Sequence, residues 1–119
     1  MTDNKEKLLQ SIKVNLELTD QETAIFLLII FEGKKTLKEI SSNFSYPLDY
    51  SKKIILSLIN KGILLEYSDN LYESFHPRFV VINRYKRLCY EKKIELKRNQ
   101  IIDNLGLILE RHYDTVRTK

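Results

Sequence analysis

Four polar residues lie within five positions near the middle of the chain, namely Asp49, Tyr50, Lys52 and Lys53. A carboxylate can accept a hydrogen bond from the N4 amino group of cytosine, and a lysine ammonium can donate to guanine or to a phosphate oxygen. These residues follow Pro47, and the apolar residues after them recur at helical spacing, so the four should lie on the early turns of a helix. Base and phosphate contact is one interpretation, and an ordinary solvated helix face is the other.

A second set of polar residues surrounds Thr36, with Lys34, Lys35 and Lys38 close by in the sequence. Thr36 and Glu39 have the spacing of a capping box, in which a threonine side chain and a glutamate side chain satisfy the first N–H groups of a helix. A helix N-terminus beside three cations could hold a phosphate group. Simple helix capping is the alternative interpretation.

Charge is distributed unevenly along the chain. Residues 78–100 contain eight basic and two acidic residues, a net charge of +6, within a chain whose net charge is +4. Arg84, Lys86 and Arg87 in this segment could hold the backbone of a nucleic acid, although a solvated basic helix would show the same pattern. In contrast, Glu66, Asp69 and Glu73 make residues 66–73 acidic, so we expect phosphates to repel that segment and keep it out of a minor groove.

Residues typical of catalysis or metal binding are few and scattered. His76 and His112 lie far apart and lack cysteine or acidic neighbours at ligand spacing, so no metal site is predicted. Cys89 lies among apolar residues with no histidine nearby, which favours a buried thiol over a nucleophile. The three glycines do not form a phosphate-binding loop. We therefore expect a protein that is not an enzyme and that needs no cofactor.

Composition is typical of a single globular domain with an appended element. The chain has 119 residues, of which 43% are hydrophobic and 30% charged. One cysteine cannot form an intrachain disulfide, and the amino terminus lacks the order of a signal peptide. The longest apolar run, 24–31, is far shorter than a membrane span. These features favour a soluble cytoplasmic protein with no membrane partner.

Hydrophobic spacing and capping signals predict the order of elements. A first helix is expected at residues 4–16, and a capping box from Thr19 to Glu22 opens a central core helix that ends before a left-handed cap at Gly33. A short helix from Thr36 to Phe44 follows, with turn residues at 45–47 and a longer helix that stops at Gly62. Two strands at 63–67 and 71–75, joined by a polar turn, complete the order of a winged helix-turn-helix with a two-stranded wing.

A long C-terminal helix is expected from about Arg78 to Tyr113, unless Gly106 divides it. Near its end lies an apolar cluster that one small domain is not expected to cover. The predicted contact between two copies of the chain therefore consists of Ile101, Ile102, Leu105, Ile108 and Leu109.

The chain resembles the TrmB-type archaeal regulators over residues 16–77. The matching motifs are Leu18-Thr-Asp-Gln-Glu22, Thr36-Leu-Lys-Glu-Ile40, Pro47, Leu58-Ile-Asn-Lys-Gly-Ile-Leu64 and the exit from Tyr72 to Pro77. The resemblance implies binding of double-stranded DNA and regulation of transcription, usually by a dimer. The sugar-binding domain of larger family members has no counterpart in the chain, so no small-molecule effector is expected. The many Lys, Ile and Asn residues favour an AT-rich genome, which fits an archaeal or viral source.

Taken together, the sequence predicts a mainly α fold of the α+β class. Residues 1–77 would form a winged helix-turn-helix domain, and residues 78–119 a helical extension that joins a homodimer. The reading element would run from Ser45 and Tyr46 to Lys53 and would bind specific DNA sequences. Two alternatives are a winged-helix module that binds other proteins and a non-specific, chromatin-type DNA binder.

Overall fold

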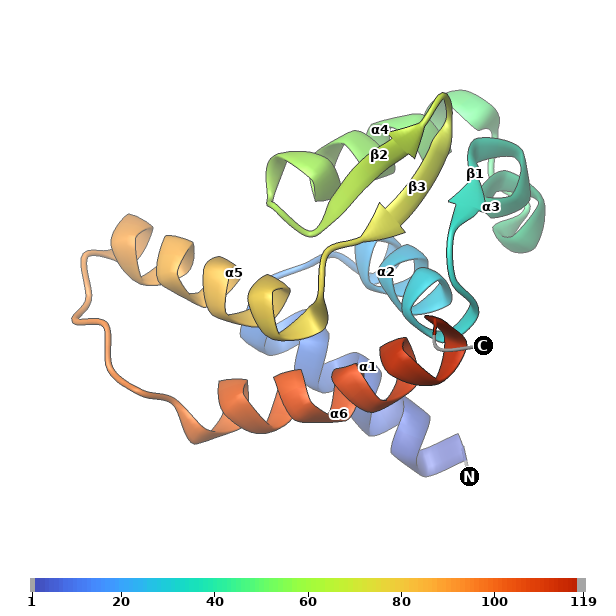
Figure 1. The fold of residues 1–119 in the computed structure, drawn as a ribbon. Helices are drawn as coiled ribbons and strands as arrows, with labels where there is room; N and C mark the ends of the chain where they lie inside the picture. The colour runs from blue at the N-terminus through green and yellow to red at the C-terminus, as the bar shows by residue number, and fades with distance from the viewer. Residues whose placement is uncertain (1, 118–119) are drawn as a thin grey trace.

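Helices make up most of the structure, and a small antiparallel sheet completes it (Figure 1). The computed structural model describes the backbone of residues 2–117 and the side chains of residues 5–117. The helices are α1 (Thr2–Leu16), α2 (Asp20–Glu32), α3 (Leu37–Phe44), α4 (Leu48–Asn60), α5 (Pro77–Lys92) and α6 (Gln100–Arg117). The strands are β1 (Lys35–Thr36), β2 (Leu64–Ser68) and β3 (Leu71–Ser74). The predicted α+β class is therefore confirmed.

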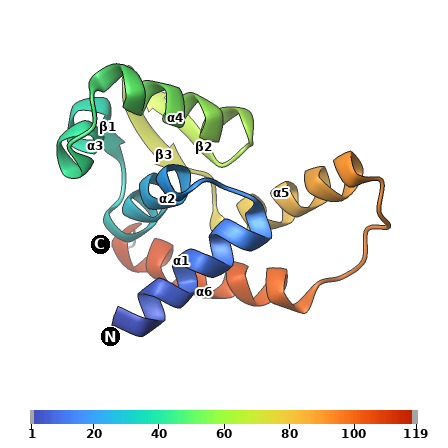
Figure 2. The same cartoon turned by 180° about the vertical axis from the view of Figure 1, so that it is seen from behind.

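Helix α2 is the core helix, as its apolar sequence predicts. Ile25, Phe26, Ile29 and Ile30 are fully buried, and α2 packs against α1, α4, α6 and β3. Figures 1 and 2 show it in the interior with the other elements around it. A helix with apolar residues on every side is stable in water only when it is enclosed in this way.

Both ends of α2 are capped. The capping box at Thr19 is confirmed: its Oγ1 accepts from the backbone N–H of Glu22 at 3.1 Å, and Glu22 Oε1 accepts from the N–H of Thr19 at 2.9 Å. Gly33 donates its N–H to Ile29 O at 2.8 Å, but its φ of 93° and ψ of −169° differ from the left-handed helical conformation that we expected.

The sheet has three strands in the order β1-β3-β2, rather than the two predicted. β1 pairs with β3 through Lys35 and Tyr72, and β2 pairs with β3 through Leu64 and Ser74. A strand of two residues is too short for an alternating pattern, so β1 could not be predicted from the sequence. Tyr72 of β3 is fully buried, which attaches the sheet to the helices.

The expectation of one long C-terminal helix is wrong. Residues 77–117 form a helical hairpin of α5 and α6 (Figure 1). Lys93 ends α5 in the left-handed conformation, with φ 56° and ψ 40°, and donates its N–H to Cys89 O and Tyr90 O. Asn99 then accepts the first N–H groups of α6 at its Oδ1. Gly106 does not break α6; a Cβ there would lie 3.1 Å from Val81 Cγ2, so the glycine lets the two helices pack closely.

This hairpin completes the core of the molecule. α5 packs on α1, and α6 packs on α2. Ile102, Leu105 and Leu109 are at most 2% exposed within a single chain, so their assignment to a contact between two copies is wrong. Ile101 and Ile108 remain 55% and 41% exposed. Within the described residues, no helix is both long and apolar enough to cross a membrane.

Arg117 connects the last turn of α6 to two other elements. Its guanidinium donates to the backbone oxygens of Ile29 and Ile30 at 3.0 and 3.2 Å. It also forms a salt bridge with Glu73 of β3, and it lies 3.8 Å from the ring centre of Tyr113. Because the last carbonyl groups of a helix lack partners within that helix, Arg117 caps α2 while it ties α6 to the sheet.

A comparison of two neighbouring isoleucines tests the corrected role of α6. Ile102→Ala should lower the free energy of unfolding by about 2–5 kcal/mol because it leaves a cavity in the core. Ile101→Ala should change it by less than about 0.5 kcal/mol, since the side chain is half exposed. Urea unfolding followed by circular dichroism measures both values. Equal losses for the two variants would contradict this packing.

Candidate nucleic-acid interface

The connection between α3 and α4 is short and well defined. Ser45 ends α3 in the left-handed conformation, with φ 57° and ψ 39°, and Tyr46 donates its N–H to Ser41 O at 3.0 Å. Pro47 then precedes α4, and its carbonyl oxygen accepts the N–H of Ser51 at 3.0 Å. The chain therefore turns from one helix into the next within three residues, which fixes the direction of α4.

A buried contact holds α3 against α4. Ser41 Oγ donates to Ser51 Oγ at 2.9 Å, and both residues are buried. Their small side chains allow a close approach of the two helices, and the hydrogen bond satisfies both hydroxyl groups. Ile55 and Leu58 on the same side of α4 are fully buried, so this side faces the core.

The opposite side of α4 is exposed to solvent. Asp49, Lys53, Leu56 and Asn60 follow one another at intervals of four, three and four residues, which places them on one helix face. All four are exposed. The main contacts of α4 are with α2, α3 and β2, and the views from both sides show α4 on the outside of the molecule, away from α1 and α6 (Figures 1 and 2). The terminal helices therefore leave this outer face of α4 open.

Aromatic rings support the first turn of α4. Tyr46 stacks on Phe44 with ring centres 5.4 Å apart, and its ring also meets that of Tyr50 edge-on at 5.1 Å. Tyr50 is 41% exposed and Leu48 is 48% exposed. Tyr46 is half-buried and positions its neighbour, while Tyr50 is available for contact with a partner.

Lys52 does not share the outer face, contrary to our prediction. Its ammonium donates to Tyr72 Oη at 2.7 Å and to Asn70 Oδ1 at 3.1 Å. The hydrogen bond to Tyr72 is the largest cause of a raised pKa for Lys52, and the charges of Glu66 and Asp69 raise it further. Lys52 thus connects α4 to the β2–β3 hairpin, and only Lys53 of the predicted lysine pair points outward.

The phosphate-binding site predicted at Thr36 is not supported by the geometry. Thr36 and Glu39 form a complete capping box, with hydrogen bonds of 2.8 and 3.1 Å, and Leu37 donates its N–H to Asn70 O. The Glu39 carboxylate occupies the place where a phosphate would bind, and the hydrogen bond from the Thr36 backbone is the main cause of its lowered pKa. An anion at this site would meet a carboxylate, and the N–H groups of Thr36, Leu37 and Glu39 already have partners.

The lysines around this capping box are also partly engaged. The Lys34 ammonium lies 4.5 Å from the ring centre of Tyr67, and Lys35 forms a salt bridge of 3.0 Å with Glu32. Lys38 is exposed on α3. Of the three lysines, Lys38 is the one best placed to reach a partner bound along α3 and α4.

Arg84 has a structural role, contrary to our prediction. It is 7% exposed, and its Nε donates to Leu16 O at 2.9 Å, at the end of α1. Arg87 is exposed and donates to Asn60 O at 2.8 Å, at the end of α4, and Lys86 is also exposed. Of these three basic residues, only Arg87 is therefore placed to meet a partner near the C-terminal end of α4, because Lys86 lies beside Leu96 and Lys97 of the α5–α6 connection.

Acidic groups dominate the hairpin. Glu66 Oε2 accepts the N–H of Asn70 at 2.9 Å, and Glu73 pairs with Arg117. Glu66 and Asp69 are exposed, so the tip keeps its negative charge. The expectation that this tip does not enter a minor groove therefore stays a prediction, with the same electrostatic reason.

A polar network that the sequence did not reveal ties α4 to α2. Glu22 accepts from Ser57 Oγ at 2.5 Å and from the Lys61 ammonium at 2.8 and 2.9 Å. Burial would raise the pKa of Glu22, but the hydrogen bonds from Lys61, Ser57 and Thr19, together with the charge of Lys61, lower it below 4.5. The capping box pointed to Glu22, but its partners lie 35 and 39 positions away in the sequence and no local pattern connects them.

Comparison of the chain with protein-family models, with curated proteins and with solved structures finds no match. The described residues also contain no group of three His, Cys, Asp or Glu side chains that could hold a metal ion. The site is therefore defined by its own geometry: an outer helix face of Asp49, Lys53, Leu56 and Asn60, with Tyr50 beside it and basic groups near the two ends of α4.

The buried network at Glu22 should make stability depend on pH. Because the pKa of Glu22 is lower in the folded state than its ordinary value of 4.5, its contribution is complete above about pH 4.5 and is lost as the pH falls through the folded-state pKa. Glu22→Gln should lower the free energy of unfolding by about 1–3 kcal/mol at pH 7 and reduce its decline in acid. Urea unfolding from pH 3 to pH 7 tests this.

Glu95→Gln is the matched control because Glu95 is exposed on the α5–α6 connection. It should leave both the stability at neutral pH and its decline in acid close to those of the unchanged protein. If the stability of Glu22→Gln declined in acid as steeply as that of the unchanged protein, Glu22 would not be the source of the pH dependence.

Proposed function

We propose that this chain is a winged-helix protein that binds specific sequences of double-stranded DNA and regulates transcription, like the TrmB-type regulators that its sequence resembles. The order of α2, β1, α3, α4, β2 and β3, with a sheet of order β1-β3-β2, supports the winged-helix assignment. The observation that carries the proposal is the position of α4. One side of this helix packs against the core, and its outer face is open to solvent.

The dimensions and chemistry of α4 suit a major groove. A helix with its side chains is about 10–12 Å across, and the groove is about 12 Å wide. Asp49 is expected to accept from cytosine, Lys53 to donate to guanine or phosphate, and Leu56 to contact a thymine methyl group. Ser45 and Tyr50, near the start of α4, can donate hydroxyl hydrogen bonds to the DNA backbone.

Basic groups near the two ends of α4 would hold the backbone on either side of the groove. Lys38 lies on α3, which precedes α4, and Arg87 lies near the C-terminal end of α4. Such contacts position a protein on DNA without reading its sequence. The outer face of α4 would then supply the specificity, and the acidic hairpin tip would stay away from phosphates.

A second candidate function is the binding of another protein. Leu48, Tyr50 and Leu56 expose apolar surface on or beside the outer face of α4, and each is between 41% and 48% exposed. Protein interfaces are enriched in aromatic groups and depleted of charge at their centres. The low charge of this face favours the candidate, and salt dependence separates it from DNA binding.

The proposal is tested by selecting bound duplexes from a randomised library and measuring their affinity by fluorescence anisotropy. A regulator should enrich a defined motif and bind it about 10³-fold or more tightly than a scrambled duplex. Affinity should fall as salt increases because phosphate contacts release counterions. Binding without an enriched motif would support the non-specific alternative. Absence of binding at low salt would support the second candidate function, binding of another protein.

Substitutions on α4 test the reading face. Lys53→Ala should weaken binding to the selected duplex by about 1–3 kcal/mol, and it should also relax the preference at one base pair. Lys97→Ala removes an exposed lysine from the α5–α6 connection, remote from α4 (Figure 1), and should have little effect. Anisotropy titrations at constant salt compare the two, and equal losses would mean that α4 has no special role.

A charge reversal at the hairpin tip tests its relation to DNA. Asp69→Arg should raise affinity severalfold and make the salt slope steeper by about 1, because a repulsive group is replaced by one that can bind a phosphate. Glu95→Arg makes the same change of charge on the α5–α6 connection and controls for net charge. A fall in affinity for Asp69→Arg alone would show that the acidic tip contacts DNA directly.

A further inference from the structure

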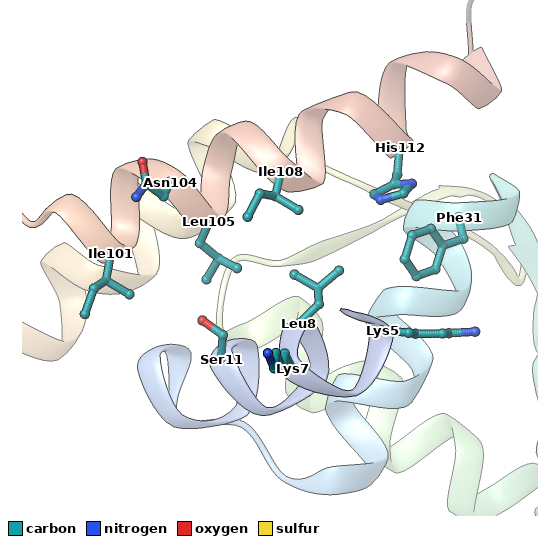
Figure 3. Close-up of a pocket in the computed structure, with 10 residues that line it drawn as sticks. All are labelled: Lys5, Lys7, Leu8, Ser11, Phe31, Ile101, Asn104, Leu105, Ile108 and His112. Atoms are coloured by element: carbon teal, nitrogen blue, oxygen red, sulfur yellow. The ribbon is translucent and has the colours of Figure 1, made fainter. Parts of the chain in front are cut away.

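An open groove of about 820 Å³ lies between α1 and α6, apart from the candidate interface on α4. Its lining is mainly apolar, and α2 contributes Phe31 to it (Figure 3). The side chains of Leu8, Leu105 and Ile108 point toward one another across the middle of the groove (Figure 3). The volume falls within the range of about 300–1,000 Å³ that is usual for small-molecule sites.

Two of the nitrogen-bearing side chains that line the groove lie together at one of its ends. Lys5, Phe31 and His112 gather at one end, and Ile101 and Asn104 lie toward the other (Figure 3). The Lys5 ammonium is 5.5 Å from the ring centre of Phe31, and the His112 ring meets the same ring edge-on at 4.5 Å. Both nitrogen-bearing groups therefore flank a single aromatic side chain, and they define a polar end of the groove.

The charge of the lining is positive. Lys5 and Lys7 line the groove, and no Asp or Glu occurs among the described residues that line it. Ser11, Asn104 and His112 add groups that can donate hydrogen bonds. A ligand that matches this surface carries a negative charge at one end and an apolar body over the rest of its length.

We infer that this groove binds an organic anion with an unbranched apolar body, such as a medium-chain carboxylate. The carboxylate would lie beside Lys5 and His112, and the chain would extend along Leu8, Leu105 and Ile108 toward Ile101. His112 and Ile101 are eleven positions apart on α6, or about 16.5 Å at the usual helical rise, which is close to the length of a dodecanoate ion. This inference goes beyond the proposed binding of DNA and differs from our expectation of no small-molecule effector.

The exposure of Ile108 is consistent with an occupant in the groove. It lines the groove and is 41% exposed, so it leaves apolar surface there for an occupant to cover. A second copy of the chain would also cover Ile108, but the two lysines of the groove would then need acidic partners from that copy. A single small anion supplies both the apolar contact and the counter-charge.

The inference is tested by calorimetric titration of the full chain with dodecanoate below its micelle concentration. Saturable binding to one site per chain is expected, and dodecyltrimethylammonium, of equal chain length and opposite charge, should bind at least about tenfold more weakly. Lys5→Gln combined with Lys7→Gln should remove most of this preference. Absence of saturable dodecanoate binding, or equal binding of the two amphiphiles, would overturn the inference.

Two adjacent residues of α6 provide a matched pair for locating the site. Ile108 lines the groove and Leu107 does not, yet their exposures are 41% and 42%. Ile108→Glu should weaken dodecanoate binding at least about tenfold, while Leu107→Glu should change it less than about twofold. Urea unfolding confirms that both variants are folded.

Equal binding by the two variants would place the ligand elsewhere and overturn the assignment. Light scattering then measures whether the unchanged protein and the Ile108→Glu variant are monomers or dimers. A dimer that Ile108→Glu converts to a monomer, without dodecanoate binding to the unchanged protein, would show that a second copy covers the groove. The experiment contains no DNA, so its outcome is separate from that of the proposed function.

Discussion

The burial of α2 is the constraint on which the rest of the structure depends. This helix has apolar side chains around its whole circumference, and Ile25, Phe26, Ile29 and Ile30 lose all contact with solvent. Each buried methylene group contributes about 0.8 kcal/mol, so exposure of any one side of α2 would be costly. Helices α1, α4 and α6 and strand β3 must therefore remain packed around it, and the orientation of the outer face of α4 follows from that packing.

Polar contacts at the two ends of α2 limit how far the neighbouring elements can shift against this helix. At its N-terminal end, Glu22 binds Ser57 and Lys61 near the end of α4. At its C-terminal end, the carbonyl oxygens of Ile29 and Ile30 accept from Arg117, which also pairs with Glu73 of β3. Apolar contacts alone allow some sliding of helices, whereas buried charged hydrogen bonds tolerate little displacement. These contacts therefore fix the positions of both α4 and the β2–β3 hairpin relative to α2.

Local signals in the sequence were sufficient for most elements of residues 1–77. The two capping boxes, the turn at Pro47 and the stop near Gly62 each act within a few residues, so they could be recognised without a structure. The end of α5 could not be recognised from the sequence, because Lys93 takes a left-handed conformation within a charged segment that lacks glycine and proline. The directions of the Arg84 and Lys52 side chains could not be predicted from the sequence either. Their partners lie 68 and 20 residues away, and composition gives no indication of such contacts.

These internal contacts change how the basic composition of the chain should be interpreted. Lys52, Lys61, Arg84 and Arg117 all donate to groups of the protein itself, so they contribute to net charge but little to a surface that could bind phosphate. A DNA-binding protein with fewer free cations makes fewer phosphate contacts, and its affinity then falls less steeply with salt. Under the proposed function, more of the binding free energy must come from groups that read bases, and the outer face of α4 would supply them. The proposed function therefore implies low affinity for random DNA, and the sequestration of cations is itself a source of specificity.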